Sequence, residues 1–473
     1  MSSRMLIACG FLLSSLISAA QVASTPPKTW VDKDTGHRIW RLSDEPNSGA
    51  FYFNVNAYTP DGKKMFYTAH DGIYVLNLAT RNSKLLVPNP PRPAGERRGP
   101  WGGVRALVAG HKTPSIFYTQ IDAQTHIASV YKANAETGAI RKLVDLPAGH
   151  GIVSVNADET LAAGTYIEGG DPRQNFGPPP PDAKDAPNLG DDKPHFQPSG
   201  KGAMMEARLK SQLPLVLFTL RLEPGPNGEK PGEEKILLHS TDWVNHLLFS
   251  PSDPALLMYC HEGPWQKVDR IWTIHTDGTA NRLIHQRTMA MEIAGHEFWG
   301  LDGETIWYDW QYPKGEDFFL AGYNLKTGQR TAYHLQRNEW SIHFNLTQDL
   351  DLFAGDGGDS GQVAKAKDGE WIELFHPERI KVSDDTLNAP GFWQPGRFRA
   401  ERLINMAHHN YRQEPNVRFS PDKKLVIFTS NMFGPSYILA AEVDKAVNPK
   451  PSDVVSTPVL ARKYNPTEPP PTR

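Results

Sequence analysis

Short segments in which hydrophobic and polar residues alternate recur along most of the chain at intervals of about 45 residues. In each copy an alternating segment leads into a turn that carries Pro-Asp-Gly or a variant, and an aromatic-rich segment follows. A period of two is typical of β-strands with one buried face. Clear copies are 56–67, 247–259 and 417–428, and weaker copies are 153–163, 298–308 and 344–353. The period predicts four short strands per repeat, which is one blade of a β-propeller.

The copies predict the number of blades and the way in which the ring closes. The six copies and the region 104–146 give seven units, so the sequence predicts an all-β, seven-bladed β-propeller. The segment 35–43 reads as a strand but precedes the first unit and has no blade of its own. We expect this N-terminal strand to pair with the last blade and close the ring, because closure leaves only short, protected strand edges.

Two stretches interrupt the repeat. The first, 169–213, is rich in Pro, Asp and Gly and ends in a segment, 201–213, with a helical pattern. We expect it to be an insertion within the third blade. The second, 380–413, precedes the last blade, and a short helix is predicted over 398–408, next to His408 and His409.

The first residues predict a secretory signal. Arg4 is followed by an apolar run, 5–20, which ends in small residues before Gln21. We therefore expect an exported protein, periplasmic or secreted, whose residues 21–473 form a single domain. No later segment approaches the roughly 20 apolar residues that a membrane-spanning helix needs. Without residues 1–20, Cys260 is the one remaining cysteine, so no intramolecular disulfide is expected.

Composition and charge narrow the classes of partner. Hydrophobic residues make up 39% of the chain, which permits one large core and argues against global disorder. The formal net charge is −3, so no basic excess exists to displace the counterions of a nucleic acid. An anionic ligand must therefore be bound by a local group of cations or by a metal ion.

Polar clusters recur at the starts of successive predicted blades, where the inner strands of a propeller approach the central channel. They are 259–270, 295–299, 340–345 and 408–416. A single His before a strand is usually a structural turn residue. Three His-bearing clusters at equivalent points of the last three blades favour a functional role for His296 and His343. Trp265, Trp299 and Trp340 are interpreted mainly as packing between blades, with sugar stacking as the alternative.

The order of several short segments carries a family resemblance. These segments are 35–43, 295–299, 355–357 and 430–435. With them, the whole of 21–473 resembles the oligogalacturonate lyases, polysaccharide lyase family twenty-two. The resemblance implies a seven-bladed propeller with its site at the mouth of the channel. It also implies metal-assisted β-elimination on an oligogalacturonide or a related uronic-acid oligomer, giving a 4,5-unsaturated uronate.

The resemblance also implies roles for single residues. By motif and order, the Brønsted base of the family falls on His296, the arginine that engages the substrate carboxylate on Arg270, and the first metal-ligand histidine on His343. Further candidates for substrate binding beside them are His261, Arg412 and Trp299.

The remaining metal ligands depart from the family pattern. The family's Gln-x-x-His-x-His run reads 411–416 here, with Glu414 and Asn416 in place of two imidazoles. We therefore predict a mixed site of His343, Glu414, Asn416 and either His409 or His408. Oxygen ligands favour Mn²⁺, with Ca²⁺ or Mg²⁺ as alternatives. The other possibility is a site without metal, in which Arg270 and Arg412 offset the charge of the uronate.

These residue types suit β-elimination. The proton on C5 of a uronate is weakly acidic, so a cation must offset the charge that develops beside the carboxylate. A neutral His near pH 7 has a well-matched pKa for removing that proton. An Arg fork suits a planar carboxylate.

Two other classes of function remain open. The first is a non-catalytic, TolB-like periplasmic propeller that binds a cell-wall or protein partner, although such a ring does not need this set of His, Arg and Glu. The second is a hydrolase in which Glu262 and Glu297 serve as acid and base. The favoured partner is an acidic oligosaccharide, bound by a monomer, with no nucleic acid.

Overall fold

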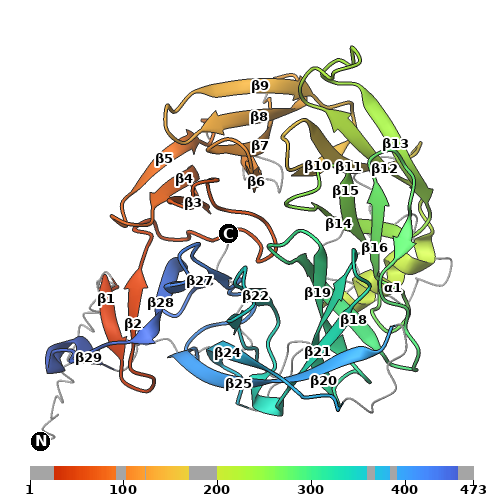
Figure 1. Cartoon of the computed structure of the whole chain (residues 1–473). Helices are drawn as coiled ribbons and strands as arrows, with labels where there is room; N and C mark the ends of the chain where they lie inside the picture. The colour runs from red at the N-terminus through yellow and green to blue at the C-terminus, as the bar shows by residue number, and fades with distance from the viewer. Residues whose placement is uncertain are drawn as a thin grey trace, which may run out of the picture.

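Strands with one well-buried face build this protein, as in β2 (His37–Arg41), where buried and partly buried side chains alternate. The computed structural model describes residues 26–91, 103–122, 124–169, 200–359, 368–383 and 391–455. Within these ranges the chain forms sheets that surround a central axis, together with one α-helix (Figure 1). The predicted all-β, propeller-like fold is thereby confirmed. The predicted signal, 1–20, lies outside the described residues.

Four sheets follow one another around the ring, and each is an antiparallel meander. The first two contain β3 (Lys64–Ala69), β4 (Gly72–Asn77) and β5 (Ser83–Pro88), and then β6 (Val104–Ala109), β7 (Ser115–Ile121), β8 (Ala128–Asn134) and β9 (Ile140–Asp145). The next two contain β10 (Gly151–Val155), β11 (Leu161–Ile167), β12 (Leu215–Arg221) and β13 (Glu234–Ser240), and then β14 (Trp243–Phe249), β15 (Leu256–Glu262), β16 (Ile271–His275) and β17 (Arg282–Leu283).

An eight-stranded sheet follows, made of two antiparallel groups. One group is β18 (Ile293–Trp299), β19 (Thr305–Gln311), β20 (Phe318–Asn324) and β21 (Arg330–Leu335), and the other is β22 (Phe344–Leu346), β23 (Phe353–Gly355), β24 (Trp371–Arg379) and β25 (Trp393–Asn405). Their outer strands, β21 and β25, pair in parallel, with Arg330 opposite Trp393. This pairing joins the two groups at their edges.

The last sheet combines the two ends of the described chain. Its order is β26 (Arg418–Phe419), β27 (Leu425–Ser430), β28 (Tyr437–Lys445), β2, β1 (Thr29–Asp32) and β29 (Val454–Val455). Strand β2 is antiparallel to β28, with Ile39 opposite Ala441. In Figure 1 the N-terminal strands, in red, therefore lie beside the C-terminal strands, in blue.

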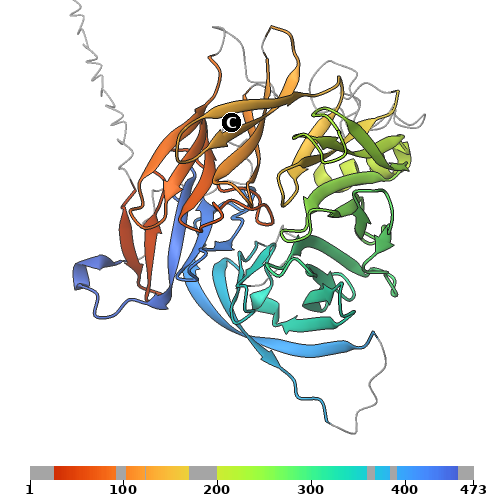
Figure 2. The ribbon, with the colours of Figure 1, turned by 45° about the horizontal axis from the view of Figure 1, so that its top comes forward.

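The two interruptions of the repeat have different outcomes. Helix α1 (Gly200–Ser211) lies between β11 and β12, so the helix predicted over 201–213 is confirmed, whereas 170–199 lies outside the described residues. The helix predicted over 398–408 is wrong, because 393–405 forms β25, which runs antiparallel to β24 (Figure 2). Its side chains alternate, with Phe398 buried between exposed Arg397 and Arg399. The second interruption thus contributes outer strands rather than a helical insertion.

The core lies between neighbouring sheets. One cluster joins Tyr67 of β3, Tyr118 of β7 and Ile427 of β27, all fully or almost fully buried. Burying a large apolar side chain contributes about 1.5–3 kcal/mol, so these contacts hold adjacent sheets at fixed angles around the axis. Among the described residues, no helix has the length and apolarity needed to cross a membrane.

Candidate active site

Two histidines lie close together, His296 in the inner strand β18 and His343 directly before the inner strand β22. The ring centroids of His296 and His343 are 4.7 Å apart. Tyr52, which precedes β3, lies 5.1 Å from His343 and 5.9 Å from His246 by the same measure. Three of the inner-strand positions therefore converge, as the predicted propeller geometry requires.

Equivalent β-bulges orient two of these histidines. In the β14–β15 pair the register shifts between Asn245 and Leu248, and in the β18–β19 pair it shifts between Gly295 and Phe298. His246 and His296 lie at the bulges with φ values of +48° and +46°. Such values are uncommon for residues other than glycine, and bulges re-aim side chains near functional sites.

His296 lies in a buried pocket against an acidic partner. Its Nδ1 is 3.3 Å from Oδ2 of Asp309, on the neighbouring strand β19. Neither carboxylate oxygen of Asp309 has a hydrogen-bond partner in the described part of the chain. Burial raises the pKa of Asp309 to about 7, against the opposing effect of Arg270. The Asp309 carboxyl group is thus close to the His296 imidazole and has no hydrogen bond to any other described group.

Trp265 forms one wall of the His296 pocket and is packed tightly against the backbone beside it. The indole of Trp265 stands edge-on to the His296 ring, with centroids 4.8 Å apart. A Cβ atom on Gly295 would come within 2.5 Å of that indole, so only glycine allows this approach. The wall of the pocket is therefore apolar and closely packed.

Arg270 is committed to two carboxylates of the protein. Its Nε donates to Glu297 at 2.9 Å, and its Nη1 donates to Glu262 at 2.7 Å. All three side chains are buried. Burial alone would raise the pKa of Glu262, but Arg270 and His246 hold it well below its usual range. The expectation that Arg270 binds the substrate carboxylate is not met in this structure, since its fork already binds protein groups.

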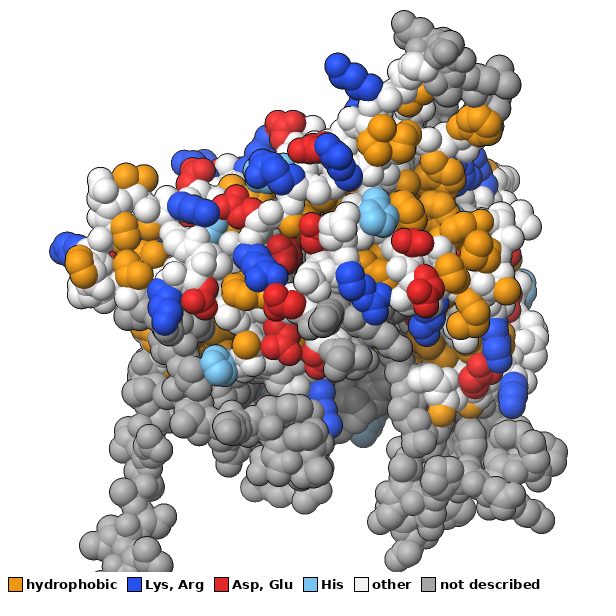
Figure 3. Space-filling view, turned by 90° about the horizontal axis from the view of Figure 1, so that it is seen from below, with side chains coloured by type: hydrophobic (Ala, Val, Ile, Leu, Met, Phe, Trp, Pro, Cys, Tyr) orange, Lys and Arg blue, Asp and Glu red, His pale blue; other side chains and the backbone are white. Residues whose placement is uncertain are grey.

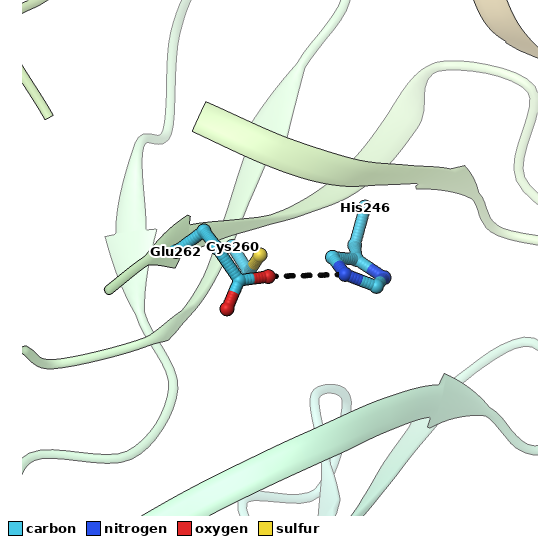
Figure 4. Close-up of side chains that lie close together, drawn as sticks. All are labelled: His246, Cys260 and Glu262. Carbon is cyan, nitrogen blue, oxygen red and sulfur yellow. Dashed lines mark ion pairs between the residues drawn. The ribbon is translucent and has the colours of Figure 1, made fainter. Parts of the chain in front are cut away.

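A second set of possible ligand atoms lies beside Arg270. His246 Nε2 is 3.1 Å from the second oxygen of Glu262, and Cys260 lies next to them (Figure 4). One ligand atom from each residue lies within 4.8 Å of the others. Burial raises the pKa of the Cys260 thiol. Sequence analysis missed His246, although it occupies the same position in β14, the fourth residue, as His296 does in β18.

His343 has the surroundings of a metal ligand. Its Nδ1 is 2.8 Å from Oδ2 of Asp356, and its backbone N–H donates to Oδ1 of the same carboxylate. When Nδ1–H donates to Asp356, Nε2 carries the lone pair. Nε2 lies 3.2 Å from the Tyr52 hydroxyl and 3.7 Å from Oε2 of Glu414.

The His343 and Glu414 pair fits one divalent cation. Metal–ligand distances are about 2.0–2.6 Å, so donor atoms 3.7 Å apart can share an ion. The set combines a nitrogen that is oriented by a carboxylate with a carboxylate oxygen. This chemistry suits Mn²⁺ and related cations.

The other predicted ligands are engaged elsewhere. Oδ1 of Asn416 accepts from the Phe53 N–H at 3.0 Å, and its Nδ2 donates to the Glu414 carbonyl. His409 is buried, with Nε2 2.7 Å from the Gln413 carbonyl and Nδ1 3.1 Å from Ser430 Oγ. Burial lowers the pKa of His409 to about 4. As ligands, His409 and the Asn416 side chain are therefore corrected to structural residues, because their donor and acceptor atoms hold the loop before β26.

The predicted substrate-binding residues make contacts of their own. Trp299 donates through Nε1 to the Leu248 carbonyl at 3.0 Å, which fits the packing interpretation. His261 packs against Trp272 and lies 3.5 Å from Asp242. Arg412 is exposed, and its backbone N–H donates to Asn410. None of these contacts is to His296.

Comparison with known proteins shows a similarity to one family. The family model described as oligogalacturonate lyase matches residues 227–447, which include His246, Arg270, His296 and His343. Over this span the chain is similar to the oligogalacturonate lyases. It is 26% identical over 227 residues to the oligogalacturonide lyase of Pectobacterium atrosepticum, with 46% of this chain and 54% of that protein covered. It is 27% identical over 230 residues to the oligogalacturonate lyase of Dickeya dadantii, with the same coverage. The chain thus matches about half the length of these curated relatives.

Solved structures of oligogalacturonate lyases share the fold over a longer span. One, described as an oligogalacturonate lyase in complex with manganese, aligns with a TM-score of 0.63 and 22% identity. Another, from Vibrio parahaemolyticus, aligns with a TM-score of 0.64 and 22% identity. Each alignment covers 88% of this chain and 96% of the other chain. The fold relationship therefore extends beyond the matched half.

Proposed function

We propose that this protein cleaves oligogalacturonides or related uronic-acid oligomers by β-elimination. The observation that carries the proposal is the buried His296–Asp309 pair, which lies against His343. A base, its orienting carboxyl group and a metal-ligand histidine are the parts that the reaction needs. A propeller that only binds a partner gains nothing from a buried carboxyl group without a hydrogen bond. The relationship to proteins named oligogalacturonate lyase supports the same reaction.

His296 acts as the base in this proposal. Ionised Asp309 accepts the Nδ1–H of His296, so Nε2 carries the lone pair that takes the proton from C5. The electrons of the C5–H bond form the C4–C5 double bond, and the bond from C4 to the glycosidic oxygen breaks. The leaving oxygen is protonated from solvent, so the products are a 4,5-unsaturated uronate and a shortened oligomer.

The cation of this proposal is held by His343 and Glu414. When bound, a divalent ion offsets the charge of the uronate carboxylate and makes the C5 proton more acidic. Mn²⁺ is the favoured ion, because one structural neighbour is described as a complex with manganese, and Ca²⁺ or Mg²⁺ are alternatives. Asp356, which contacts Nδ1 of His343, would leave Nε2 of His343 available to the ion.

Arg270 is assigned a positioning role. Its guanidinium lies between Glu262 and Glu297, and Glu297 directly follows His296 in the chain. Two buried carboxylates without this cation would repel each other and distort the bulge that presents His296. Arg270 therefore maintains the geometry of the base.

The finer architecture belongs to the same proposal. We count the eight-stranded sheet as two blades, which gives seven, and we assign β1 and β2 to the closure of the ring through β28. We also propose that residues 21–473 form one exported domain. Export would bring the protein to oligomers outside the cytoplasm.

A direct assay tests the proposal. Purified protein with Mn²⁺ is incubated with galacturonide oligomers, and the absorbance of the unsaturated uronate is followed in the ultraviolet. We expect product from the wild type and a loss of at least about 100-fold in His296→Gln, the size of a general-base contribution. His70→Gln, an exposed histidine far along the chain, is the control. No product from the wild type with any uronate oligomer would contradict the proposal.

A further inference from the structure

A large cavity opens beside the candidate active site. Its volume is about 880 Å³, and it lies between the inner strands β6, β10 and β14 and the segment before β3. Tyr52 and His246 line it, and both also contact the site residues, through His343 and Glu262 respectively. A chain bound at His296 and His343 can therefore continue over Tyr52 and His246 into this cavity.

The cavity wall differs from the rest of the protein in its content of charged residues. The described residues that line the cavity include one arginine, Arg105, and no aspartate or glutamate. The whole chain, in contrast, has 53 acidic residues and a net charge of −3. Figure 3 shows that positive and negative side chains are intermixed over the face it presents. The described lining thus presents one cationic side chain and no carboxylate to the cavity.

Arg105 is placed to receive an anion. It is the second residue of the inner strand β6, and His246 and His296 also lie on inner strands, β14 and β18. Its side chain is accessible, and no hydrogen bond or ion pair to it is found within the described ranges. Burial lowers the pKa of its guanidinium, and no carboxylate among the described residues acts against this effect. Arginine in proteins is usually paired, and its planar fork matches a carboxylate.

We propose that Arg105 binds the carboxylate of a second uronate unit, on the part of the oligomer that extends beyond the sugar held at His296 and His343. The inference rests on the proposed function, since it assumes that a uronic-acid oligomer is the substrate. Asn245, adjacent to His246, lines the same wall. No side-chain hydrogen bond of its amide is found among the described residues. The subsite makes the protein select for oligomers with successive free carboxylates.

The test compares chain lengths. Values of kcat/KM are measured with galacturonide dimer, trimer and tetramer, and with a trimer whose carboxylates are methyl esters, for wild type, Arg105→Ala and Arg105→Lys. We expect Arg105→Ala to lower the ratio of trimer to dimer kcat/KM by at least about tenfold, as for the loss of one charge-assisted pair. Arg105→Lys should recover part of the ratio, because it keeps the charge without the fork.

A matched control and a binding measurement complete the test. Arg399→Ala removes an exposed arginine from β25, outside the cavity, and should keep the wild-type ratio. An unchanged ratio in Arg105→Ala would overturn the subsite. If the wild type cleaves no oligomer, the proposed function fails, and calorimetric titration with uncleaved trimer decides the inference separately. Equal trimer affinity in wild type and Arg105→Ala would then overturn it, and weaker binding in the variant would support it.

Discussion

Oδ2 of Asp309 lies 3.3 Å from Nδ1 of His296, and both residues are buried where two neighbouring strands meet at a bulge. A carboxyl group without a described hydrogen bond is costly inside a protein. A role in orienting His296, whose backbone conformation is strained, accounts for the presence of Asp309 at this place.

The first prediction concerns the rate of Asp309→Asn. The amide cannot act as an anionic acceptor for the Nδ1–H of His296, so we expect kcat to fall by about 10- to 100-fold, up to the lower end of the range of general-base effects, with little change in KM. The wild-type rate should rise as the pH passes about 7, where Asp309 ionises, and the Asn variant should lack this rise. Rate profiles from pH 5 to 9 measure both. Equal profiles for the two proteins would remove Asp309 from the mechanism.

The second prediction is that Asp309→Asn, which lowers the rate, raises the stability of the folded protein. Burial raises the pKa of Asp309 to about 7, above an unfolded value of about 3.9. The folded protein therefore keeps a proton that the unfolded chain releases, and the contribution of Asp309 to stability is lost as the pH rises through this window. Relative to wild type, Asp309→Asn should gain up to about 1.4 kcal/mol per pH unit across it. Urea unfolding at pH 5 and pH 8 measures the gain, and a constant difference would contradict it.

The third prediction separates a positioning role of Arg270 from substrate binding. Removing this guanidinium leaves Glu262 and Glu297 buried without their cation, so Arg270→Ala should lower the free energy of unfolding by about 3–5 kcal/mol. Arg399→Ala provides the exposed control. If Arg270 instead binds substrate, its variant will show an unchanged unfolding transition and a raised KM.

The fourth prediction concerns the cation. Glu414→Gln should weaken Mn²⁺ binding by at least about tenfold, the effect seen for residues that support metal sites, because it removes the charged donor opposite His343. Glu442→Gln, a partner of Trp40 on the last sheet, is the control. Calorimetric titration of metal-free protein measures the affinity. Full activity in chelator, with no bound metal by elemental analysis, would assign charge neutralisation to protein side chains instead.

The repeat predicted much of the fold, because its alternation records which strand faces are buried. It failed over 398–408, where Arg, Ala, Glu and Leu favour a helix by intrinsic propensity. Pairing with β24 and β21 outweighs that propensity, and Phe398 is buried on one face of the strand.

The candidate site was predictable only in part. His296 and His343 precede repeats at equivalent points, so their positions could be inferred from spacing. Asp309 could not, because it lies within the strand sequence Tyr-Asp-Trp, and only the cross-strand register opposite Gly295 brings it to His296. The ion pairs of Arg270 with Glu262 and Glu297 likewise depend on which strands lie side by side, and the local sequence around Arg270 does not determine this.

The central claim is that the glycosidic bond is cleaved by elimination. Digestion of a galacturonide trimer in water enriched in ¹⁸O, followed by mass spectrometry of the products, tests this claim most directly. The account predicts an unsaturated product that is lighter than the corresponding saturated sugar by one water, with no ¹⁸O introduced by the cleavage. Saturated products that carry one ¹⁸O per bond broken would show hydrolysis and contradict the account.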